Sequence, residues 1–379
     1  MKIGDVFEAH VRDMTSEGQA VVSAPNGRSV FVSGLWLGET ARVRITALKG
    51  RVGFAELEEI LLPSASRRSP PCQFHGVSKH HCGGCPWMHV DYNAQLQAKQ
   101  KRVEHAMARL SEKIEVQAIQ PSADHLGYRN RVQFKTDGEK LGFVAAKSNT
   151  LVDVDDCLVL SEANRFSLKK LREQLPNAGW RPLKRQKWTT LDIDEATAAA
   201  NVSVNQRLSF QQANTRQNQY MHQWLMGILS QIKDKRYALE LFCGSGNFTE
   251  ILSRAGFAKI IAVEGQSDAV VELESRKLAG VSAEVRDLFD EKALASLVQN
   301  HREARFMLLD PPRDGLKSRA ALLSTKSKLR EVVYISCDLA TFSRDLRDFI
   351  EAGFKVKELQ PLDQFPQTPH IELLCYMAR

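Results

Sequence analysis

Cys337 lies at the end of an apolar run, Val332–Ser336, and directly before a segment that can begin a helix. Its neighbours Ser336, Asp338 and Thr341 are polar, which argues against the packed small hydrophobe that a free cysteine usually is. A helix start also favours the thiolate, the reactive form of a cysteine. The residues around Cys337 therefore indicate a nucleophile that can add to an electron-poor carbon and form a covalent intermediate.

Two carboxyl groups accompany this cysteine in the sequence. His370-Ile371-Glu372 leads into a last apolar strand, and an apolar setting raises the pKa of a carboxyl group, so Glu372 is a candidate general base. Phe306–Leu309 is a buried-type strand that ends in Asp310-Pro311-Pro312. The prolines stiffen the exit from the strand and hold Asp310 at the carboxyl edge of a sheet, where open α/β sheets bind ligands.

A glycine-rich turn provides a candidate cofactor site. The apolar strand Ala238–Leu241 runs into Gly244-Ser245-Gly246, and a helix follows. Glycines allow the tight turn and a close approach of the backbone to a ligand. Glu264 stands at the tip of the next strand, 20 residues after Gly244, a position that suits hydrogen bonds to ribose hydroxyls. Asp287, after the third expected strand, is placed to reach the adenine side.

The turn favours S-adenosyl-L-methionine (SAM) over NAD. Residue 249 is Thr, so the third glycine of the dinucleotide motif is missing, and with it a clear cradle for a pyrophosphate. SAM has a ribose and an adenine but no phosphate. The alternative is a Rossmann-like core whose pocket holds no cofactor.

The residue after Asp-Pro-Pro distinguishes between kinds of methylation. An aromatic residue there would stack on a base and indicate methylation of an amino group, but Arg313 stands in its place and favours methylation of carbon. Carbon 5 of uracil is a poor nucleophile, but addition of a thiolate at carbon 6 produces an enolate whose carbon 5 can attack the methyl group of SAM. A base must then remove the carbon-5 proton so that the cysteine is eliminated. Cys337 and Glu372 are the predicted nucleophile and base.

The chain resembles the bacterial RNA (uracil-5-)-methyltransferases, because five sequence blocks occur in the order of that family. The blocks are Phe210–Asn214, Leu241–Phe248, Asp310–Arg313, Ser336–Thr341 and Phe365–Glu372. The resemblance covers essentially the whole chain, since residues 1–60 resemble a TRAM domain and Cys72–Cys157 the family's iron–sulfur region. It implies Cys337 as nucleophile, Glu372 as base, and contacts to SAM from Gln212, Phe242, Glu264 and Asp310, with Asn247 and Asp287 as further candidates.

The cysteines indicate a metal or cluster site rather than disulfides. Their number, seven, is odd, which argues against a disulfide framework. Cys82-Gly83-Gly84-Cys85 brings two sulfurs together, with Cys72 before it and Cys157 far after it. Zinc and a [4Fe–4S] cluster both accept four thiolates, and the spacing of the cysteines hardly distinguishes between these two kinds of site. The resemblance favours a [4Fe–4S] cluster, although the nine residues between Cys72 and Cys82 exceed the family's usual first gap.

The chain of 379 residues is long enough for two or three domains. Short strands and an Asn26-Gly27 hairpin turn predict an OB-like barrel over residues 1–62. We interpret residues 68–200 as a mixed central domain that binds the iron–sulfur cluster and RNA. A helix is expected over residues 93–110 and can pack on the catalytic domain. Residues 201–379 alternate strands and helices, as in a doubly wound, Rossmann-like class I SAM methyltransferase.

The composition is compatible with an RNA partner. The net charge is +7, a mild indication of a polyanionic ligand. Residues 165–188 contain eight Lys or Arg residues, with Phe166, Trp180 and Trp188 between them. Such a run is usually a solvated face, but beside a uracil-modifying site it can also contact phosphates and stack bases. No stretch has transmembrane length and no signal peptide begins the sequence, so we expect a cytoplasmic enzyme without an obligate protein partner.

The hypothesis is a SAM-dependent RNA uracil-5-methyltransferase, and the barrel and cluster favour 23S rRNA over tRNA as its substrate. A cytosine-5 enzyme would carry an additional cysteine directly after a proline in the Asp310 loop, and none is there. A noncatalytic RNA-binding protein that retains the SAM fold is the alternative from another class. The presence of both Cys337 and Glu372 argues against it.

Overall fold

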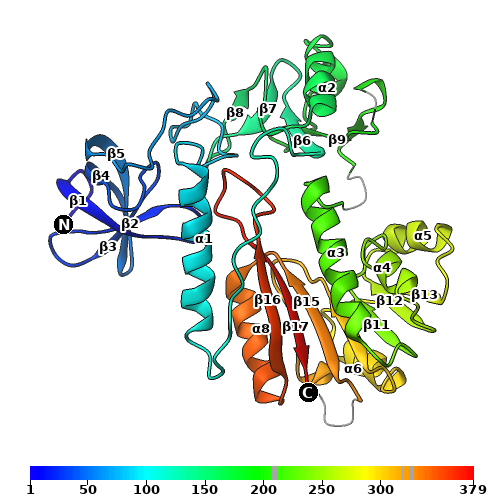
Figure 1. Ribbon diagram of the computed structural model, residues 1–379. Coiled ribbons are helices and arrows are strands. Elements are labelled where there is room, and N and C mark those ends of the chain that lie inside the picture. Colours follow the sequence, from blue (N-terminus) through cyan, green and yellow to red (C-terminus); the bar gives the residue numbers. More distant parts are fainter. Residues whose placement is uncertain (198, 207–210, 318, 324–327) are drawn as a thin grey trace. The chain divides into compact units, whose positions relative to one another are not determined.

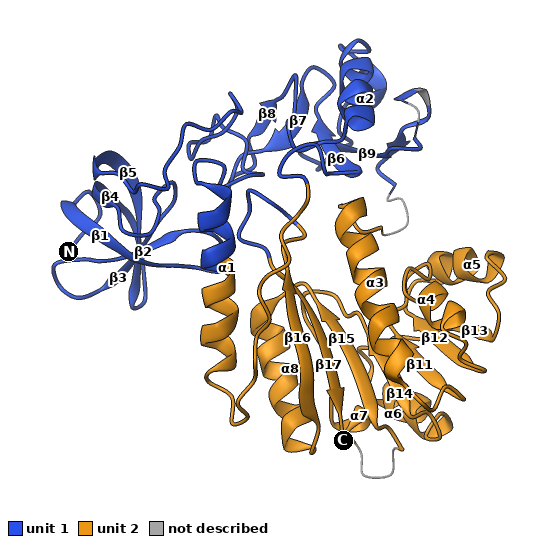
Figure 2. Cartoon of the chain, in the orientation of Figure 1, with its two compact units in different colours: residues 1–98, 124–208, 365–370 blue, residues 99–123, 209–364, 371–379 orange. Residues whose placement is uncertain are grey.

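The protein forms two compact units, which Figure 2 colours separately. The computed structural model (Figure 1) describes residues 1–197, 199–206, 211–317, 319–323 and 328–379. Unit 1 comprises residues 1–98, 124–208 and 365–370, and unit 2 comprises residues 99–123, 209–364 and 371–379. The division into three domains remains a prediction. No helix in the described ranges is both long and apolar enough to cross a membrane.

The N-terminal part of unit 1 is a closed barrel with the strand order β1-β2-β3-β5-β4. Its strands are β1 (Val6–Met14), β2 (Ala20–Ser23), β3 (Ser29–Val32), β4 (Thr40–Lys49) and β5 (Val52–Leu62). Ala20 pairs with Val32 across the hairpin, whose turn uses Gly27 at a φ of 80°, as the Asn-Gly dipeptide predicts. Alternate residues such as Val30 and Val32 are fully buried inside the barrel. The predicted five-stranded barrel is confirmed.

The rest of unit 1 combines a five-stranded sheet with the cysteine segment. The sheet has the order β10-β9-β6-β7-β8, and α2 packs on one face of it through Leu168 and Leu171, against Phe134 and Leu191. The elements are β6 (Arg131–Thr136), β7 (Leu141–Val144), β8 (Leu151–Asp153), α2 (Glu162–Arg172), η1 (Ala178–Trp180), β9 (Thr189–Asp194), η2 (Ala199–Asn201) and β10 (Ser203–Val204). Before the sheet, α1 (Tyr92–Met107) begins in unit 1 and continues into unit 2.

Unit 2 is built on a seven-stranded sheet with the order β13-β12-β11-β14-β15-β17-β16. The strands are β11 (Ala238–Leu241), β12 (Ile260–Glu264), β13 (Val281–Val285), β14 (Phe306–Leu309), β15 (Glu331–Ser336), β16 (Lys355–Leu362) and β17 (Glu372–Ala378). β11 to β15 are parallel, and β17 is antiparallel to both of its neighbours. Central strands such as β14 are apolar and buried throughout, because helices cover both faces of the sheet.

The helices of unit 2 form the two outer layers (Figure 1). They are α3 (Thr215–Gln231), α4 (Thr249–Arg254), α5 (Ser267–Ser275), α6 (Glu291–Asn300), α7 (Arg319–Leu322) and α8 (Leu339–Glu351). α3 and α4 bury Leu225 and Ile251 in one core, whereas α6 and α8 bury Leu297 and Phe342 in the other. The predicted doubly wound α/β architecture is confirmed.

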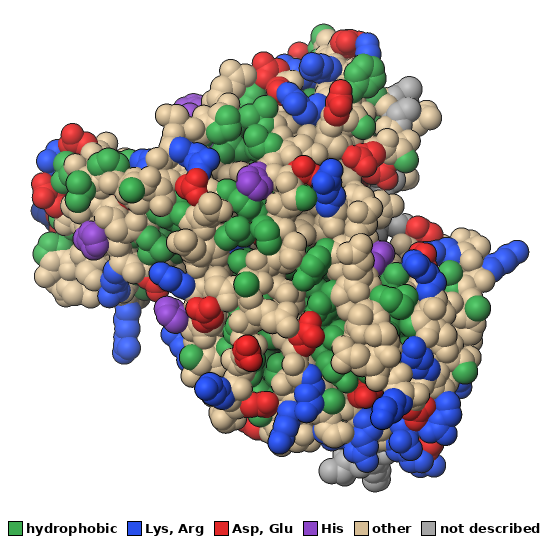
Figure 3. Space-filling model, in the orientation of Figure 1, with side chains coloured by type: hydrophobic (Ala, Val, Ile, Leu, Met, Phe, Trp, Pro, Cys, Tyr) green, Lys and Arg blue, Asp and Glu red, His purple; other side chains and the backbone are tan. Residues whose placement is uncertain are grey.

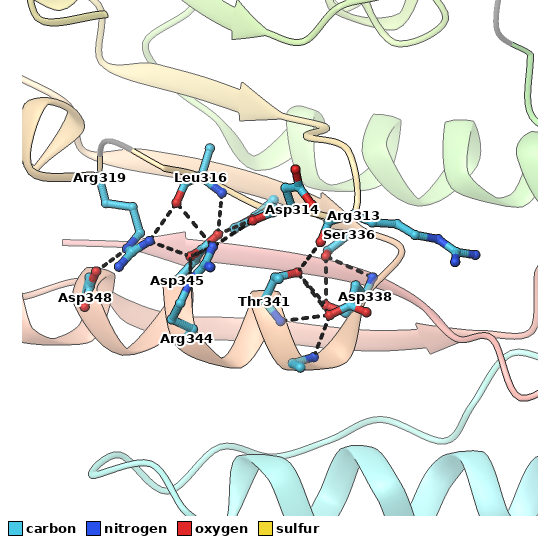
Figure 4. A network of polar contacts seen from close by, with 12 residues as sticks. Arg313, Asp314, Leu316, Arg319, Ser336, Asp338, Thr341, Arg344, Asp345 and Asp348 are labelled. Carbon is cyan, nitrogen blue, oxygen red and sulfur yellow. Dashed lines mark hydrogen bonds and ion pairs between the residues drawn. The ribbon is translucent and has the colours of Figure 1, made fainter. Parts of the chain in front are cut away.

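The carboxylate of Asp345 joins α8 to two other segments of unit 2 (Figure 4). Asp345 is 0% exposed, and one of its oxygens accepts hydrogen bonds from the Leu316 backbone N–H and the Tyr334 hydroxyl, both at 2.7 Å. The other oxygen lies 2.8 Å from the Arg344 guanidinium and 3.1 Å from that of Arg319. Because both oxygens are engaged and two cations balance the charge, the carboxylate can be buried.

The first turn of α8 makes a second contact with the chain segment that follows β14. Asp338 caps the helix by accepting hydrogen bonds from the backbone N–H groups of Ala340 and Thr341. The Thr341 hydroxyl in turn donates to the carbonyl of Arg313 at 3.0 Å. The start of α8 and the Arg313 loop are therefore tied directly to each other.

Gly315 is required by this contact. It has a φ of 66°, and a Cβ at this position would lie 2.6 Å from an oxygen of Asp345. Arg344 extends over the same loop and donates to the carbonyl of Asp314 at 3.0 Å. A side chain larger than hydrogen would strain the backbone and displace the loop from α8.

We predict that Asp345→Ala lowers the free energy of unfolding by about 2 to 4 kcal/mol, because it leaves the Leu316 backbone N–H and the buried Tyr334 hydroxyl without their acceptor. The control is Asp348→Ala, which removes a partly exposed partner of Arg319 from the same helix and should cost less than about 1 kcal/mol. Urea unfolding of both variants measures the difference. Equal destabilisation would show that the Asp345 contacts do not hold unit 2 together.

Candidate active site and cysteine site

The topology of unit 2 brings most of the predicted site residues to one edge of the sheet. Parallel strands end on the same side, and β17, which runs the other way, begins there. The residues placed at this edge are Phe242 after β11, Glu264 at the end of β12, Asp287 after β13, Asp310 after β14, Cys337 after β15 and Glu372 at the start of β17. This is the edge where open α/β sheets bind ligands.

Cys337 and Glu372 are neighbours because of the register between β15 and β17. Ser336 pairs with Leu373, so the next residue of each strand tip lies beside the other. Glu372 is 4% exposed, and Cys337 is partly buried. Burial raises the pKa of the Cys337 thiol to about 12, with the charges of Glu372 and Asp310 acting in the same direction. A thiol and a carboxyl group therefore share one poorly hydrated site.

Burial disfavours the thiolate form of Cys337, against the expectation from the helix start, because it raises the pKa of the thiol. Burial also raises the pKa of Glu372 well above its usual value, and the charge of Asp310 raises it further. Arg313 acts in the opposite direction on both groups and lowers both pKa values. In Figure 4 its side chain extends away from the network around Asp338.

Two acidic residues connect this site to the glycine-rich turn. Burial raises the pKa of Asp310 to about 7, with a further contribution from the charge of Glu264. The Glu264 carboxylate accepts hydrogen bonds from the backbone N–H groups of Gly244 at 3.1 Å, Gly265 at 2.8 Å and Gln266 at 3.1 Å. Glu264 thereby holds the end of β12 against the turn that follows β11.

The turn itself leaves space for a ligand. Phe242, Gly244 and Gly246 have positive φ values of 63°, 54° and 92°. A Cβ on Gly246 would lie 2.5 Å from the Leu273 side chain, so this glycine allows α5 to pack on the turn. A Cβ on Gly244 would meet nothing within 4 Å. The space next to Gly244 is therefore open, on the side of the turn that Glu264 contacts.

The remaining residues that were predicted to contact SAM form hydrogen bonds within the protein. Gln212 is buried and accepts a hydrogen bond from the Gln364 amide at 2.9 Å. Asn247 exchanges two hydrogen bonds of 3.0 Å with Asn218 of α3, so it ties the turn to that helix. Asp287 is exposed and accepts a hydrogen bond from the backbone N–H of Phe289 at 2.8 Å. Phe210, the first residue of the Gln212 block, lies outside the described residues.

Glu240 is a residue of this region that the sequence argument missed. It lies in β11, is 1% exposed, and has the Thr249 hydroxyl beside it, which lowers its pKa against the larger effect of burial. Burial raises the pKa of Glu240 to about 8, so it is mostly protonated at neutral pH. Its signal was a single acidic residue inside an otherwise apolar strand just before the glycine-rich turn.

The four cysteines of the predicted metal site come together in unit 1. Cys72, Cys82, Cys85 and Cys157 line one small cavity, together with apolar side chains such as Met88. Burial raises the pKa values of Cys82 and Cys85 and raises that of Cys157 to about 11. Negative charge on the neighbouring thiolates raises these pKa values further.

Within the described ranges, no group of three or more Cys, His, Asp or Glu side chains has the arrangement of a metal-ion site. Cys243 and Cys375 are buried in the cores of unit 2, as free cysteines with a packing role usually are.

Comparison with known proteins identifies the family. Residues 190–379 match the family described as tRNA (Uracil-5-)-methyltransferase, and residues 1–57 match the TRAM domain. The chain is 41% identical to an uncharacterized RNA methyltransferase of Nitrosomonas europaea, over 97% of this chain and 95% of that protein. It is 29% identical to the 23S rRNA (uracil(1939)-C(5))-methyltransferase RlmD of Halomonas elongata, over 98% of this chain and 89% of that protein.

A solved structure supports the fold. The tRNA (uracil-54, C5)-methyltransferase of Pyrococcus abyssi, in complex with S-adenosyl-L-homocysteine, superimposes with a TM-score of 0.70. The two proteins are 20% identical over 98% of this chain and 100% of the other. The barrel, the class I sheet and the sequence matches agree, and the chain belongs to the tRNA (uracil-5-)-methyltransferase family, as a SAM-dependent RNA uracil-5-methyltransferase.

Proposed function

We propose that this enzyme methylates carbon 5 of a uridine in 23S rRNA, with Cys337 as the nucleophile and Glu372 as the general base. The observation that carries the proposal is the pairing of β15 with β17, which sets a thiol and a buried carboxyl group side by side at the ligand-binding edge. Carbon-5 methylation of uracil requires this combination, since one group must add to carbon 6 and another must remove the proton from carbon 5.

The two residues act in sequence. The deprotonated sulfur of Cys337 adds to carbon 6, and the electron pair of the double bond moves into an enolate that reaches carbon 5. Carbon 5 would then form a bond to the methyl group that SAM supplies as an electrophile, and S-adenosyl-L-homocysteine would be the leaving group. Glu372 then accepts the proton from carbon 5, the carbon–carbon double bond forms again, and the sulfur leaves carbon 6. The charge of Arg313, which lowers the pKa of Cys337, favours the thiolate that begins the sequence.

The SAM site in this proposal lies along the neighbouring strand tips. Glu264 and Asp310 bind the polar groups of the cofactor, and Gln212 and Phe242 complete the pocket, with Asn247 and Asp287 as further contacts. The open space next to Gly244 supports this placement.

We also propose that Cys72, Cys82, Cys85 and Cys157 hold a [4Fe–4S] cluster. Such a cluster binds each thiolate to a different iron, so its ligands surround a volume rather than a single ion. The shared cavity of the four thiols supports this arrangement, and iron would relieve the repulsion between buried thiolates. Methyl transfer moves no net electrons, so the role assigned to the cluster is to tie residue 157 to the loop of residues 72–85.

The preference for 23S rRNA rests on relatives. The RlmD enzymes of Halomonas elongata and of Pseudomonas savastanoi pv. phaseolicola, both named for 23S rRNA, are 29% and 28% identical over nearly the whole chain. The family description and the Pyrococcus abyssi enzyme refer to tRNA, which makes tRNA the second candidate. Mapping 5-methyluridine in both RNAs from a strain that lacks this protein decides between them. Loss of one site in 23S rRNA is the expected result, and an intact pattern in both RNAs contradicts the proposal.

Cys337→Ala should abolish methylation while SAM still binds, because Cys337 follows β15, two strands away from the glycine-rich turn after β11. Transfer of tritium from labelled SAM to RNA measures activity, and calorimetry measures SAM binding. The matched control is Cys375→Ala, which removes a buried thiol of β17 and should keep activity at temperatures where the variant is folded. Normal methylation by Cys337→Ala would exclude the covalent mechanism.

Glu372→Gln should allow addition and methyl transfer but not removal of the carbon-5 proton. The enzyme would then remain attached to RNA through Cys337. A band of reduced mobility on a denaturing gel, formed only when SAM is present, is the expected result. It should disappear in the double variant with Cys337→Ala. If Glu372→Gln releases product at the normal rate, another group is the base.

Protein purified without oxygen should be brown and contain about four irons per chain. Replacing Cys82 or Cys157 with Ser should remove the iron and lower the melting temperature of unit 1, because ligation closes a long chain segment. Metal analysis and circular dichroism measure both effects. Zinc in place of iron would refute the cluster and leave the methyltransferase assignment untouched.

A further inference from the structure

The edge of the unit 2 sheet opposite the active site carries a row of Lys and Arg residues. In the order of the sheet, each strand from β12 to β16 has a cation at this end. The row consists of Lys259 before β12, Arg236 before β11, Arg305 before β14, Arg330 before β15, Arg379 after β17 and Lys355 at the start of β16. We call this row the basic edge.

Backbone hydrogen bonds show that the cations of the basic edge are neighbours. Arg330 donates to the carbonyl of Arg305 at 2.8 Å, and Arg379 donates to the carbonyl of Arg330 at 2.9 Å. At the other end of the row, the backbone N–H of Ala238 donates to the carbonyl of Lys259 at 2.9 Å. With strands about 4.8 Å apart, the row extends over about 24 Å. Figure 3 shows many Lys and Arg side chains, with a few acidic ones between them, at the lower right of the view.

Acidic side chains offset only part of this charge. Asp234 pairs with Arg236 at 2.7 Å and lies 3.4 Å from Arg305. Glu303 is close enough for its charge to act on Arg236 and Arg305, and Glu331 is the first residue of β15. In the described part of the chain, no acidic side chain forms an ion pair with Lys259 or Lys355. Several of these cations are exposed, Arg330 and Lys355 among them. The basic edge therefore keeps an excess of accessible positive charge.

Two of the cations are held in place by aromatic rings. The Lys259 ammonium lies 4.4 Å from the centre of the Tyr237 ring, and the Arg379 guanidinium lies 4.5 Å from that of Phe354. Burial lowers the pKa of Arg379, and the charge of Arg330 lowers it further, which shows that like charges face each other here. Like charges on neighbouring strands are unfavourable for folding, so the row has no evident benefit for stability.

We propose that the basic edge binds phosphates of the substrate RNA at a distance from the target uridine. RNA is the substrate class of the enzyme, and a linear row of cations is complementary to a phosphate backbone. The parallel strands between the two edges have four to six residues, which separates the basic edge from the catalytic edge by roughly 13 to 20 Å. An RNA that contacts both edges must extend well beyond the nucleotides around the flipped base.

The test compares two triple variants with equal changes in charge. Lys259→Gln, Arg330→Gln and Lys355→Gln together remove three cations of the basic edge. The control, Lys101→Gln, Lys292→Gln and Arg347→Gln, removes three exposed cations that lie on helices of unit 2. Filter binding measures the affinity of each protein for a 23S rRNA transcript and for a short stem–loop that carries only the target uridine.

The edge variant should bind the long transcript at least about tenfold more weakly than the wild type. The slope of its log affinity against log salt concentration should be smaller by about 2 to 3, since each phosphate contact contributes about 0.7 to 0.9 to that slope. Binding of the stem–loop and its kcat should stay within twofold of the wild type, and the control variant should resemble the wild type with both RNAs. Equal behaviour of the two variants overturns the proposal, as does an equal loss with the long and the short RNA. Because binding is measured apart from methylation, a wild type that binds 23S rRNA without methylating it would contradict the proposed function and leave this test valid.

Discussion

The buried carboxylate of Asp345 is the contact on which the geometry of the active site depends. It receives hydrogen bonds from the loop that follows β14 and from β15, and these two segments carry Asp310 and Cys337. An error in either loop would separate the thiol from the groups that act with it. Glu372 is positioned independently, through the register of β17 against β15. The geometry of the site therefore depends on the hydrogen bonds of Asp345 and on the pairing of these two strands.

This arrangement concentrates acidic groups around one thiol. Burial raises the pKa values of Cys337, Glu372 and Asp310 together, and Arg313 is the cation that opposes this effect on the first two. The mechanism proposed above begins with the thiolate, which burial disfavours, so Arg313 is the residue of this site that favours the first step.

The residues at the strand tips could be predicted from sequence because parallel strands end at a common edge. That rule placed Glu264, Asp310 and Cys337 correctly at one edge. The contact between Cys337 and Glu372 could not be derived in this way, because it depends on β17 lying between β15 and β16. Asp345 and Glu240 were missed for a related reason. A single sequence does not show which acidic side chain faces a core and which faces water, and both are almost completely buried.

The parallel sheet also separates charge between its two edges. The tips of β12 and β14 place Glu264 and Asp310 at the catalytic edge, and returns from helices place cations such as Arg305 and Arg330 at the opposite edge. Buried carboxyl groups and one cation, Arg313, surround Cys337. In the proposed function an RNA substrate therefore presents a neutral base to the catalytic edge, while its phosphates find more positive charge at the opposite edge.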